Sequence, residues 1–272
     1  MEYSDSIPDT FPNEIIPPDE IVRDATPEEV ITISSGNFAR VVRISQIAIK
    51  IYSPQAKSHH DLEKRIYERI GIHPFILQYF GETPADSIVG RGLMFEYHHL
   101  GNLAFNIEYI KPLPSTSGTN SWPFEATEAI RYTHSRGIIH GDIGLHNFLV
   151  ADRHNLVLAD FGGSSIDGSP CLVMASIRYI APSYMENMTG NPTVKHDLFA
   201  LGTVLYEISA GRPLNYSFTD YQIRELFMQR NFPFANTDIF GVADVVEKCW
   251  MEEYNNAEEV VDDLIAISAS LK

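Results

Sequence analysis

Two short polar motifs follow each other in a fixed order near the middle of this chain. The segment HGDIGLHN spans residues 140–147, and Asp160-Phe161-Gly162 follows in the same stretch. Between them lie two short strand-like runs, Phe148 to Ala151 and Leu156 to Ala159, on either side of a polar turn. The pattern predicts a hairpin that holds both polar segments on one rigid support.

The residue types in this run suit phosphoryl transfer. Asp142 carries a carboxylate that can orient an attacking hydroxyl or accept its proton. Asn147 and Asp160 carry amide and carboxylate oxygens, which are ligands that Mg²⁺ prefers. A lone Asp would more simply be a turn or cap residue, but the order and the flanking strands together favour a catalytic set.

These residues resemble the eukaryotic protein-kinase family. HGDIGLHN stands where that family has H-R-D-L-x-x-x-N, and residues 160–162 match its D-F-G. The resemblance continues in order over residues 30–270. It implies a bilobal α+β fold, with ATP and Mg²⁺ as cofactors and protein hydroxyls as acceptors. Asp142 would be the catalytic carboxylate, and Asn147 and Asp160 the metal ligands.

The resemblance extends to the nucleotide site of the smaller lobe. Ala48-Ile49-Lys50 is similar to the A-x-K of the family's third strand, so Ala48 would line the nucleotide site and Lys50 would neutralise the α- and β-phosphates. Glu63 is the expected ion-pair partner of Lys50, with Glu68 as the rival on the same helical pattern. Glu63 is favoured because it lies one turn from the apolar face at residues 66–67.

Phe95-Glu96-Tyr97-His98 resembles the hinge between the lobes. Backbone groups around Glu96 and His98 would hydrogen-bond adenine, and Phe95 would be the gatekeeper. A buried edge strand would have a similar sequence. Four further side chains resemble the apolar column that links the lobes, namely Tyr67, Tyr79, His140 and Phe161.

Two later segments separate protein kinases from small-molecule kinases. Arg178 to Ser183 resembles the R-Y-x-A-P-E that closes an activation segment, and Asp197 to Gly202 resembles the D-x-W-S-x-G that opens a central helix. Aminoglycoside- and choline-type phosphotransferases share an H-G-D loop but lack both segments. Ser176 in front of the first segment favours Ser/Thr over Tyr as the acceptor.

The glycine-rich loop and the catalytic loop depart from the family pattern. Against G-x-G-x-x-G-x-V, residues 34–41 keep only Gly36, whose backbone can still approach phosphate. Gly141 replaces the arginine that would pair with a phosphorylated activation segment, so we predict activity without that phosphorylation. Gly144 replaces a lysine aimed at the transferring phosphate, and His146 nearby would usually be neutral. Slow turnover is the expected result.

A buried ion pair of the family is also missing. Ser183 replaces the glutamate that follows Ala-Pro, and residues 249–256 contain no arginine to pair with it. Losing both partners costs far less than stranding one charge. These departures leave two alternatives open, a pseudokinase scaffold and a small-molecule phosphotransferase. Retention of the base, the lysine and the metal ligands favours an active protein kinase with a role in signalling.

Hydrophobic periodicity predicts an arm and two lobes. Residues 1–29 are rich in proline and acids and read as a partly disordered arm; residues 30–272 form the kinase domain, with lobes at 30–97 and 98–272. The expected strands are Phe38 to Ile44, Ile47 to Tyr52, Phe75 to Phe80 and Leu93 to Tyr97. The expected helices cover residues 62–70, 123–136, 198–210, 220–230, 242–250 and 257–271, and a Pro/Ser-rich loop covers Pro112 to Ser121.

Charge and composition narrow the partners and the compartment. With 20 Lys and Arg against 36 Asp and Glu, the formal net charge is −16, which argues against nucleic acid and for protein partners. Two distant cysteines, Cys171 and Cys249, indicate a reducing compartment. No apolar run long enough to span a bilayer and no secretion signal are visible, so we expect a cytoplasmic or nuclear protein.

Overall fold

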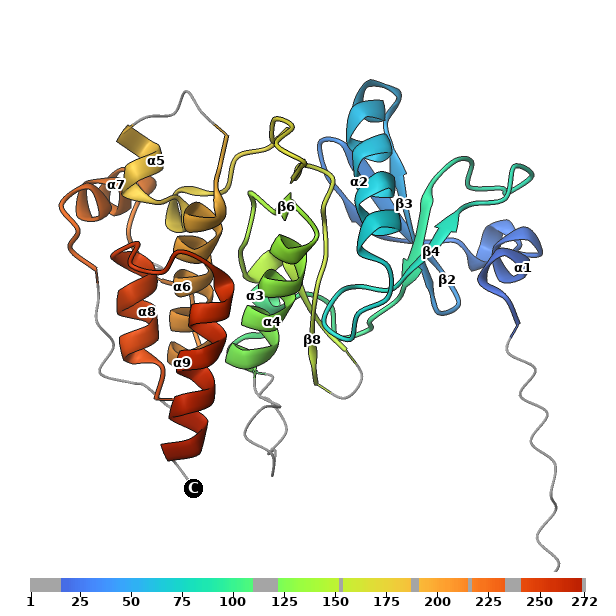
Figure 1. Cartoon of the computed structure of the whole chain (residues 1–272). Helices are drawn as coiled ribbons and strands as arrows, with labels where there is room; N and C mark the ends of the chain where they lie inside the picture. The colour runs from blue at the N-terminus through green and yellow to red at the C-terminus, as the bar shows by residue number, and fades with distance from the viewer. Residues whose placement is uncertain are drawn as a thin grey trace, which may run out of the picture.

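The computed structural model describes residues 16–109, 122–151, 154–186, 191–214, 217–232 and 241–270. The predicted Pro112 to Ser121 loop and the first fifteen residues of the predicted arm lie outside these ranges. Strands dominate the first part of the chain and helices the second, and Figure 1 shows them as two lobes side by side. The predicted bilobal α+β fold is confirmed.

A five-stranded antiparallel sheet forms the body of the smaller lobe, in the order β1-β2-β3-β5-β4. The predicted strand Ile47 to Tyr52 keeps these bounds as β3. The other strands are β1 (Ile31–Ser35), β2 (Ala39–Ile44), β4 (Tyr79–Glu82) and β5 (Leu93–Glu96).

The central strand β3 presents two different faces. Ile47 and Ile49 are buried in an apolar cluster on one side of the sheet. Successive side chains of a strand point to opposite faces, so Ala48, Lys50 and Tyr52 lie on the other side. Helix α2 (Lys57–Ile70) contacts β3 on that side and brings the carboxylate of Glu63 within reach of Lys50.

A short helix, α1 (Pro18–Arg23), packs on the opposite face of the sheet through Val22. Val22 is fully buried in the same cluster as Ile49 and Met94. Figure 1 shows α1 at the far side of the smaller lobe, away from the helices of the larger one. The described part of the predicted arm, residues 16–29, therefore includes an ordered and docked segment that the sequence did not indicate. The domain boundary itself stays a prediction.

The larger lobe is built around α6 (Val194–Ala210), most of whose residues are buried. It contacts α4 (Trp122–Ser135) and α8 (Ala243–Trp250), and α9 (Ala257–Ser270) packs on α4 (Figure 1). Helix α6 ends at Gly211, which adopts the left-handed conformation with φ of 65°. The shorter helices are α3 (Leu103–Asn106), α5 (Pro182–Glu186) and α7 (Asp220–Met228).

The predicted hairpin is present as β7 (Phe148–Val150) and β8 (Leu156–Leu158). The amide of Ala159 donates to the carbonyl of Asn147 at 2.8 Å, which extends the pairing by one residue. Asn147 and Asp160 therefore emerge at the same end of the hairpin. A second small pair, β6 (Ile138–Ile139) and β9 (Ser165–Ile166), lies beside the loop that carries His140.

The predicted strand Phe75 to Phe80 is wrong over its first four residues, because β4 begins only at Tyr79. The earlier residues bond to the hairpin of the larger lobe instead. The amide of Leu77 donates to the carbonyl of Leu158, and the amide of Leu158 donates to the carbonyl of Phe75, both at 2.9 Å. This apolar run therefore ties the two lobes together rather than extending the sheet.

Candidate active site

Lys50 stands at the centre of the cleft between the lobes. Its ammonium nitrogen lies 3.1 Å from Glu63 Oε1 and 2.7 Å from Asp160 Oδ1. Glu63 comes from α2 and Asp160 from the segment after β8, so three distant parts of the chain meet here. Of the two acids considered from sequence, the structure brings Glu63 to the lysine; Glu68 is exposed and faces Lys64.

The charges of this trio support one another. Burial works against the charged amine, but Asp160 and Glu63 together raise the pKa of Lys50 well above its usual value. The positive charge of Lys50 in turn holds the pKa of Asp160 below its usual value. Lys50 and Asp160 are therefore both ionised at neutral pH, as ion pairing with phosphate and metal requires.

A cavity of about 440 Å³ lies next to Lys50, which is within the range of small-ligand sites. Ala48 lines it from the sheet, and Glu96 and His98 line it from the connection between the lobes. Two hydrogen bonds of 3.0 Å fix the hinge backbone. The amide of Glu96 donates to the carbonyl of Gln78, and the amide of Tyr97 donates to the carbonyl of Gln46. Phe95 is buried and also lines this cavity.

A neighbouring cavity of about 540 Å³ holds the rest of the predicted set. Lys50, Asp142 and Asp160 all line it, together with Gly36 from the turn between β1 and β2. Lys50 and Asp160 also line the first cavity, so the two spaces are parts of one cleft. The side chains of Lys50 and Asp160, which are 110 positions apart in the chain, thus face one hollow.

The catalytic-loop residues are held in defined orientations. The Asn147 side-chain amide donates from Nδ2 to the carbonyl of Asp142 at 2.8 Å, which leaves its Oδ1 as an acceptor. Asp160 adopts a left-handed backbone with φ of 64°, a conformation that non-glycine residues rarely take. Such conformations persist where the surroundings hold them, and here Lys50 bonds its carboxylate. An amide oxygen and a carboxylate are thus presented at one end of the hairpin.

Four rings form a continuous chain of contacts from the sheet to the catalytic loop. Tyr67 contacts Tyr79 and Phe161, with ring centroids 5.5 and 5.2 Å apart, and Phe161 contacts His140 at 4.9 Å. The members are those proposed from the sequence. They belong to α2, β4 and the two polar segments, so direct ring contacts join the two lobes.

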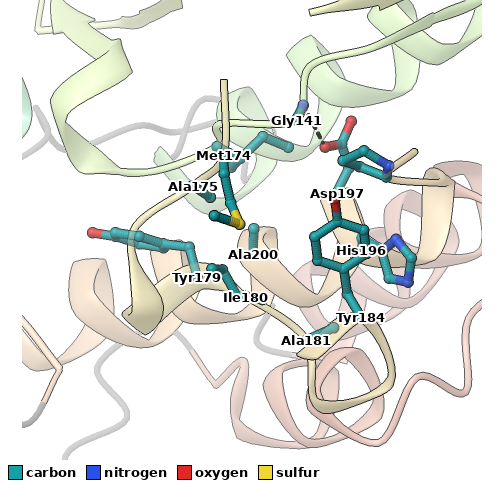
Figure 2. A pocket seen from close by; sticks show the side chains of 12 residues that line it. Gly141, Met174, Ala175, Tyr179, Ile180, Ala181, Tyr184, His196, Asp197 and Ala200 are labelled. Atoms are coloured by element: carbon teal, nitrogen blue, oxygen red, sulfur yellow. Dashed lines mark hydrogen bonds between the residues drawn. The ribbon is translucent and has the colours of Figure 1, made fainter. Parts of the chain in front are cut away.

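Asp197, at the start of α6, anchors the backbone of the catalytic loop. Its carboxylate accepts from the amide of His140 at 2.8 Å and from the amide of Gly141 at 2.9 Å, and it bonds His134 Nε2 at 2.9 Å. Figure 2 shows the bond between Asp197 and Gly141 beside a small second pocket. Burial opposes ionisation, but these bonds hold the pKa of Asp197 below its usual value.

The segment that precedes Arg178 packs directly against Gly141, the position at which the family has an arginine. Gly141 has a φ of 75°, and a Cβ on it would lie 2.8 Å from the sulfur of Cys171. Met174 and Ala175 of the same segment line the pocket in Figure 2, opposite α6. Apolar packing therefore occupies the place of an arginine side chain.

The ring of His146 fills the space beside Gly144. A Cβ on Gly144 would lie 2.6 Å from the imidazole ring and 3.0 Å from Tyr179. Partial burial alone would lower the pKa of His146, but the neighbouring carboxylate of Asp142, 3.5 Å away, outweighs it and the pKa is raised. The carboxylate of Asp142 thus favours the protonated form of the imidazole.

The site of the missing ion pair contains a different bond. The hydroxyl of Ser183 donates to Glu252 Oε2 at 2.5 Å, and Lys195 bonds the Glu252 carbonyl at 3.0 Å. The sequence indicated that both family partners were absent, but not that a hydroxyl and a carboxylate would replace them. The activation segment therefore remains tied to the end of α8.

Two residues near the cleft were missed from the sequence. The Tyr52 hydroxyl donates to Glu63 Oε2 at 2.6 Å. His59 bonds the carbonyl of Gly162 at 2.9 Å and stacks on Phe38 of the glycine-rich loop, with ring centroids 4.4 Å apart. Strand alternation could have indicated Tyr52, because it lies two residues after Lys50. No sequence signal pointed to His59.

Comparisons with known proteins match most of the chain to one family. The family described as "Protein kinase domain" matches residues 28–267. "Probable serine/threonine-protein kinase gdt2" of Dictyostelium discoideum is 29% identical over 235 residues, which cover 80% of this chain and 14% of that protein. "cAMP-dependent protein kinase, catalytic subunit-like" of Caenorhabditis briggsae is 25% identical over 239 residues, covering 81% of this chain and 59% of that protein.

A third relative matches a shorter part of the chain. "Protein kinase C epsilon type" of Oryctolagus cuniculus is 30% identical over 156 residues, or 56% of this chain and 20% of that protein. The chain therefore spans between 14% and 59% of the length of these relatives. In the ranges that the structure describes, every helix is too short or too polar to cross a lipid bilayer.

Proposed function

Because this chain belongs to the eukaryotic protein kinase family, we propose that it transfers the γ-phosphate of ATP to hydroxyls of protein substrates, Ser or Thr rather than Tyr. The observation that carries the proposal is the convergence of Lys50, Asp142 and Asp160 on one cleft. A scaffold that only binds partners needs no such set. The named Ser/Thr kinases among the relatives support the choice of acceptor.

The proposed division of roles follows from the contacts. Lys50, held by Glu63, binds phosphate oxygens, and the backbone at Gly36 approaches them from above. Glu96 and His98 bind the base through their backbone, with Ala48 against its face. Asp142 orients the substrate hydroxyl and accepts its proton as the phosphorus–oxygen bond forms. The two sets of residues line adjoining parts of the cleft.

The donor set fits a magnesium ion bound with a nucleotide. Asn147 Oδ1 and the Asp160 carboxylate are hard oxygen ligands, and Mg²⁺ in such sites takes few protein ligands together with phosphate and water. Bound Mg²⁺ would neutralise charge that develops on the phosphate oxygens. Asp160 serves both this role and the ion pair with Lys50, which fixes its carboxylate in the cleft.

The test of the proposed function is a transfer assay on a peptide library with labelled ATP and Mg²⁺, comparing the natural chain with Asp160→Ala. We expect the natural chain to label Ser- or Thr-containing peptides in a Mg²⁺-dependent manner, and the variant to lose this labelling. Equal background in both proteins would leave a pseudokinase scaffold. Labelling of small alcohols without labelling of peptides would indicate a small-molecule phosphotransferase.

We also predict that the activity does not depend on phosphorylation of the activation segment. Gly141 offers no guanidinium to a phosphate, and Cys171 already packs against it. Treatment with a broad phosphatase, followed by its removal, should leave the rate of peptide labelling within about twofold of the untreated protein. Mass spectrometry would verify that phosphate was removed. A rate that collapses after treatment and returns on rephosphorylation would contradict the prediction.

A further inference from the structure

We propose that Tyr52 is a positioning residue for nucleotide binding: its hydroxyl holds one oxygen of Glu63, so that the other oxygen stays on Lys50. None of the roles in nucleotide binding and phosphate transfer proposed above involves Tyr52. The nucleotide part of this inference rests on the proposed function, because it supposes that Lys50 binds ATP. The structural part concerns the protein without nucleotide.

The strand geometry places Tyr52 beside the lysine. Both residues belong to β3, two positions apart, so their side chains emerge on the same face of the sheet towards α2. The Lys50 ammonium lies 5.1 Å from the centroid of the Tyr52 ring, a distance at which a cation is attracted to an aromatic face. Strand β3 thus holds Glu63 with two side chains rather than one.

The two oxygens of the Glu63 carboxylate have different partners. Oε1 accepts from Lys50 at 3.1 Å and from the amide of Phe161 at 3.0 Å. Oε2 accepts from the Tyr52 hydroxyl at 2.6 Å. Among the residues that the structure describes, this hydroxyl is the one hydrogen-bond donor to Oε2. The side chain of Glu63 is buried, with 1% of its surface exposed. Without Tyr52 a buried carboxylate oxygen would lack a donor, which favours rotation of the carboxylate away from Lys50.

The surroundings of Tyr52 support this role. Burial and the charge of Glu63 raise the pKa of Tyr52, so its hydroxyl remains a protonated donor. Burial likewise raises the pKa of Glu63, and the bonds from Lys50 and Tyr52 oppose that change. A Cβ on Gly162 would lie 2.4 Å from the Tyr52 hydroxyl, so the hydroxyl fills the space that the glycine leaves open. Tyr52 therefore touches both the α2 carboxylate and the segment that carries Asp160.

The first measurement is the affinity for Mg²⁺ with a non-hydrolysable ATP analogue. Tyr52→Phe removes only the hydroxyl, and we expect about tenfold weaker binding, the effect typical of losing one hydrogen bond to a charged group. Tyr132→Phe is the matched control, because the Tyr132 hydroxyl donates to the carbonyl of Ile70 at the C-terminal end of α2, at 2.7 Å and two turns from Glu63. The control should bind the analogue like the natural chain. Equal binding by Tyr52→Phe and the natural chain would argue against the inference.

A double-mutant cycle separates positioning from general stability. If Tyr52 acts through Glu63, Tyr52→Phe should cause no further loss of analogue binding in a Glu63→Ala background. Losses that multiply, each about as large as in the single variants, would show that Tyr52 acts independently of Glu63. That result would overturn the inference even if Tyr52→Phe weakened binding.

A third measurement needs no nucleotide. The amide of Phe161 donates to Glu63 Oε1, so a carboxylate that moves should expose this amide to hydrogen exchange. We expect faster exchange at Phe161 in Tyr52→Phe but not in Tyr132→Phe. Unchanged exchange would overturn the inference, whatever the binding data show. A natural chain that bound no analogue would instead refute the proposed function, and the exchange rates alone would then decide the role of Tyr52.

Discussion

Replacing Asp142 with Asn should lower kcat for peptide phosphorylation by about 10²- to 10⁴-fold, the range typical for loss of a general base. The amide has almost the same shape, but it cannot accept the proton of the substrate hydroxyl. The backbone carbonyl of residue 142 still accepts from Asn147, so the metal-binding side of the loop is preserved. We therefore expect the affinity for the Mg²⁺–ATP analogue to stay within about threefold of that of the natural chain.

Single-turnover measurement is the appropriate assay for Asp142→Asn, because turnover of the natural chain is expected to be slow. Asp262→Asn is a control of the same chemistry on the exposed side of α9, and it should match the natural chain. A full rate for Asp142→Asn would remove this residue from the mechanism. Loss of analogue binding along with the rate would mean that the residue organises the site rather than the chemical step.

Replacing Asp197 with Asn should destabilise the protein by about 3 kcal/mol, because one oxygen that accepts backbone amides becomes a donor facing a donor. The amides of His140 and Gly141 both point at this buried carboxylate. For a domain of this size the change corresponds to a fall in Tm of about 6–12 °C. Calorimetry would measure it, and Asp262→Asn should shift Tm by less than about 2 °C.

The destabilisation by Asp197→Asn should depend on pH in one direction. Hydrogen bonds hold the folded-state pKa of Asp197 below its usual 3.8, so its ionisation stabilises the folded chain fully above that value. This stabilisation is lost as the pH falls through the folded-state pKa. Urea titrations from pH 7 downwards should therefore show that the difference in the free energy of unfolding between the natural chain and Asp197→Asn becomes smaller in acid. A difference that became larger in acid would mean that Asp197 is not held ionised by its neighbours.

The parts of the fold that sequence predicted are those with a strong local pattern. Helix α6 carries apolar residues on every side and a terminal glycine, and β3 alternates between a buried face and a functional face. The short helix α1 escaped prediction because Val22 and Ile21 dock on the sheet, a tertiary contact that no local pattern reveals. The first four residues of the predicted strand Phe75 to Phe80 were wrong for a related reason. Its backbone bonds were taken by Leu158, a partner that no local pattern reveals.

The candidate site follows the same division. Lys50, Asp142 and Asp160 could be proposed together because each lies in a motif with fixed order, and the fold does bring them to one cleft. The bonds of Tyr52 and His59 depend on where α2 sits relative to β3 and the segment after β8, which is a matter of tertiary packing. The ring of His146 over Gly144 could not be inferred either, because the sequence does not indicate which way a side chain turns.

The bond between Ser183 and Glu252 bears on how relatives with altered motifs should be classified as catalytically active or inactive. Scoring by motif letters would count two losses here, a missing glutamate and a missing arginine. A hydrogen bond nevertheless joins the two segments, with Ser183 as the donor and Glu252 as the acceptor. The acid therefore lies after α8 and not after Ala-Pro. A survey that asks which atoms meet, rather than which letters survive, would keep such chains among the candidates for assay.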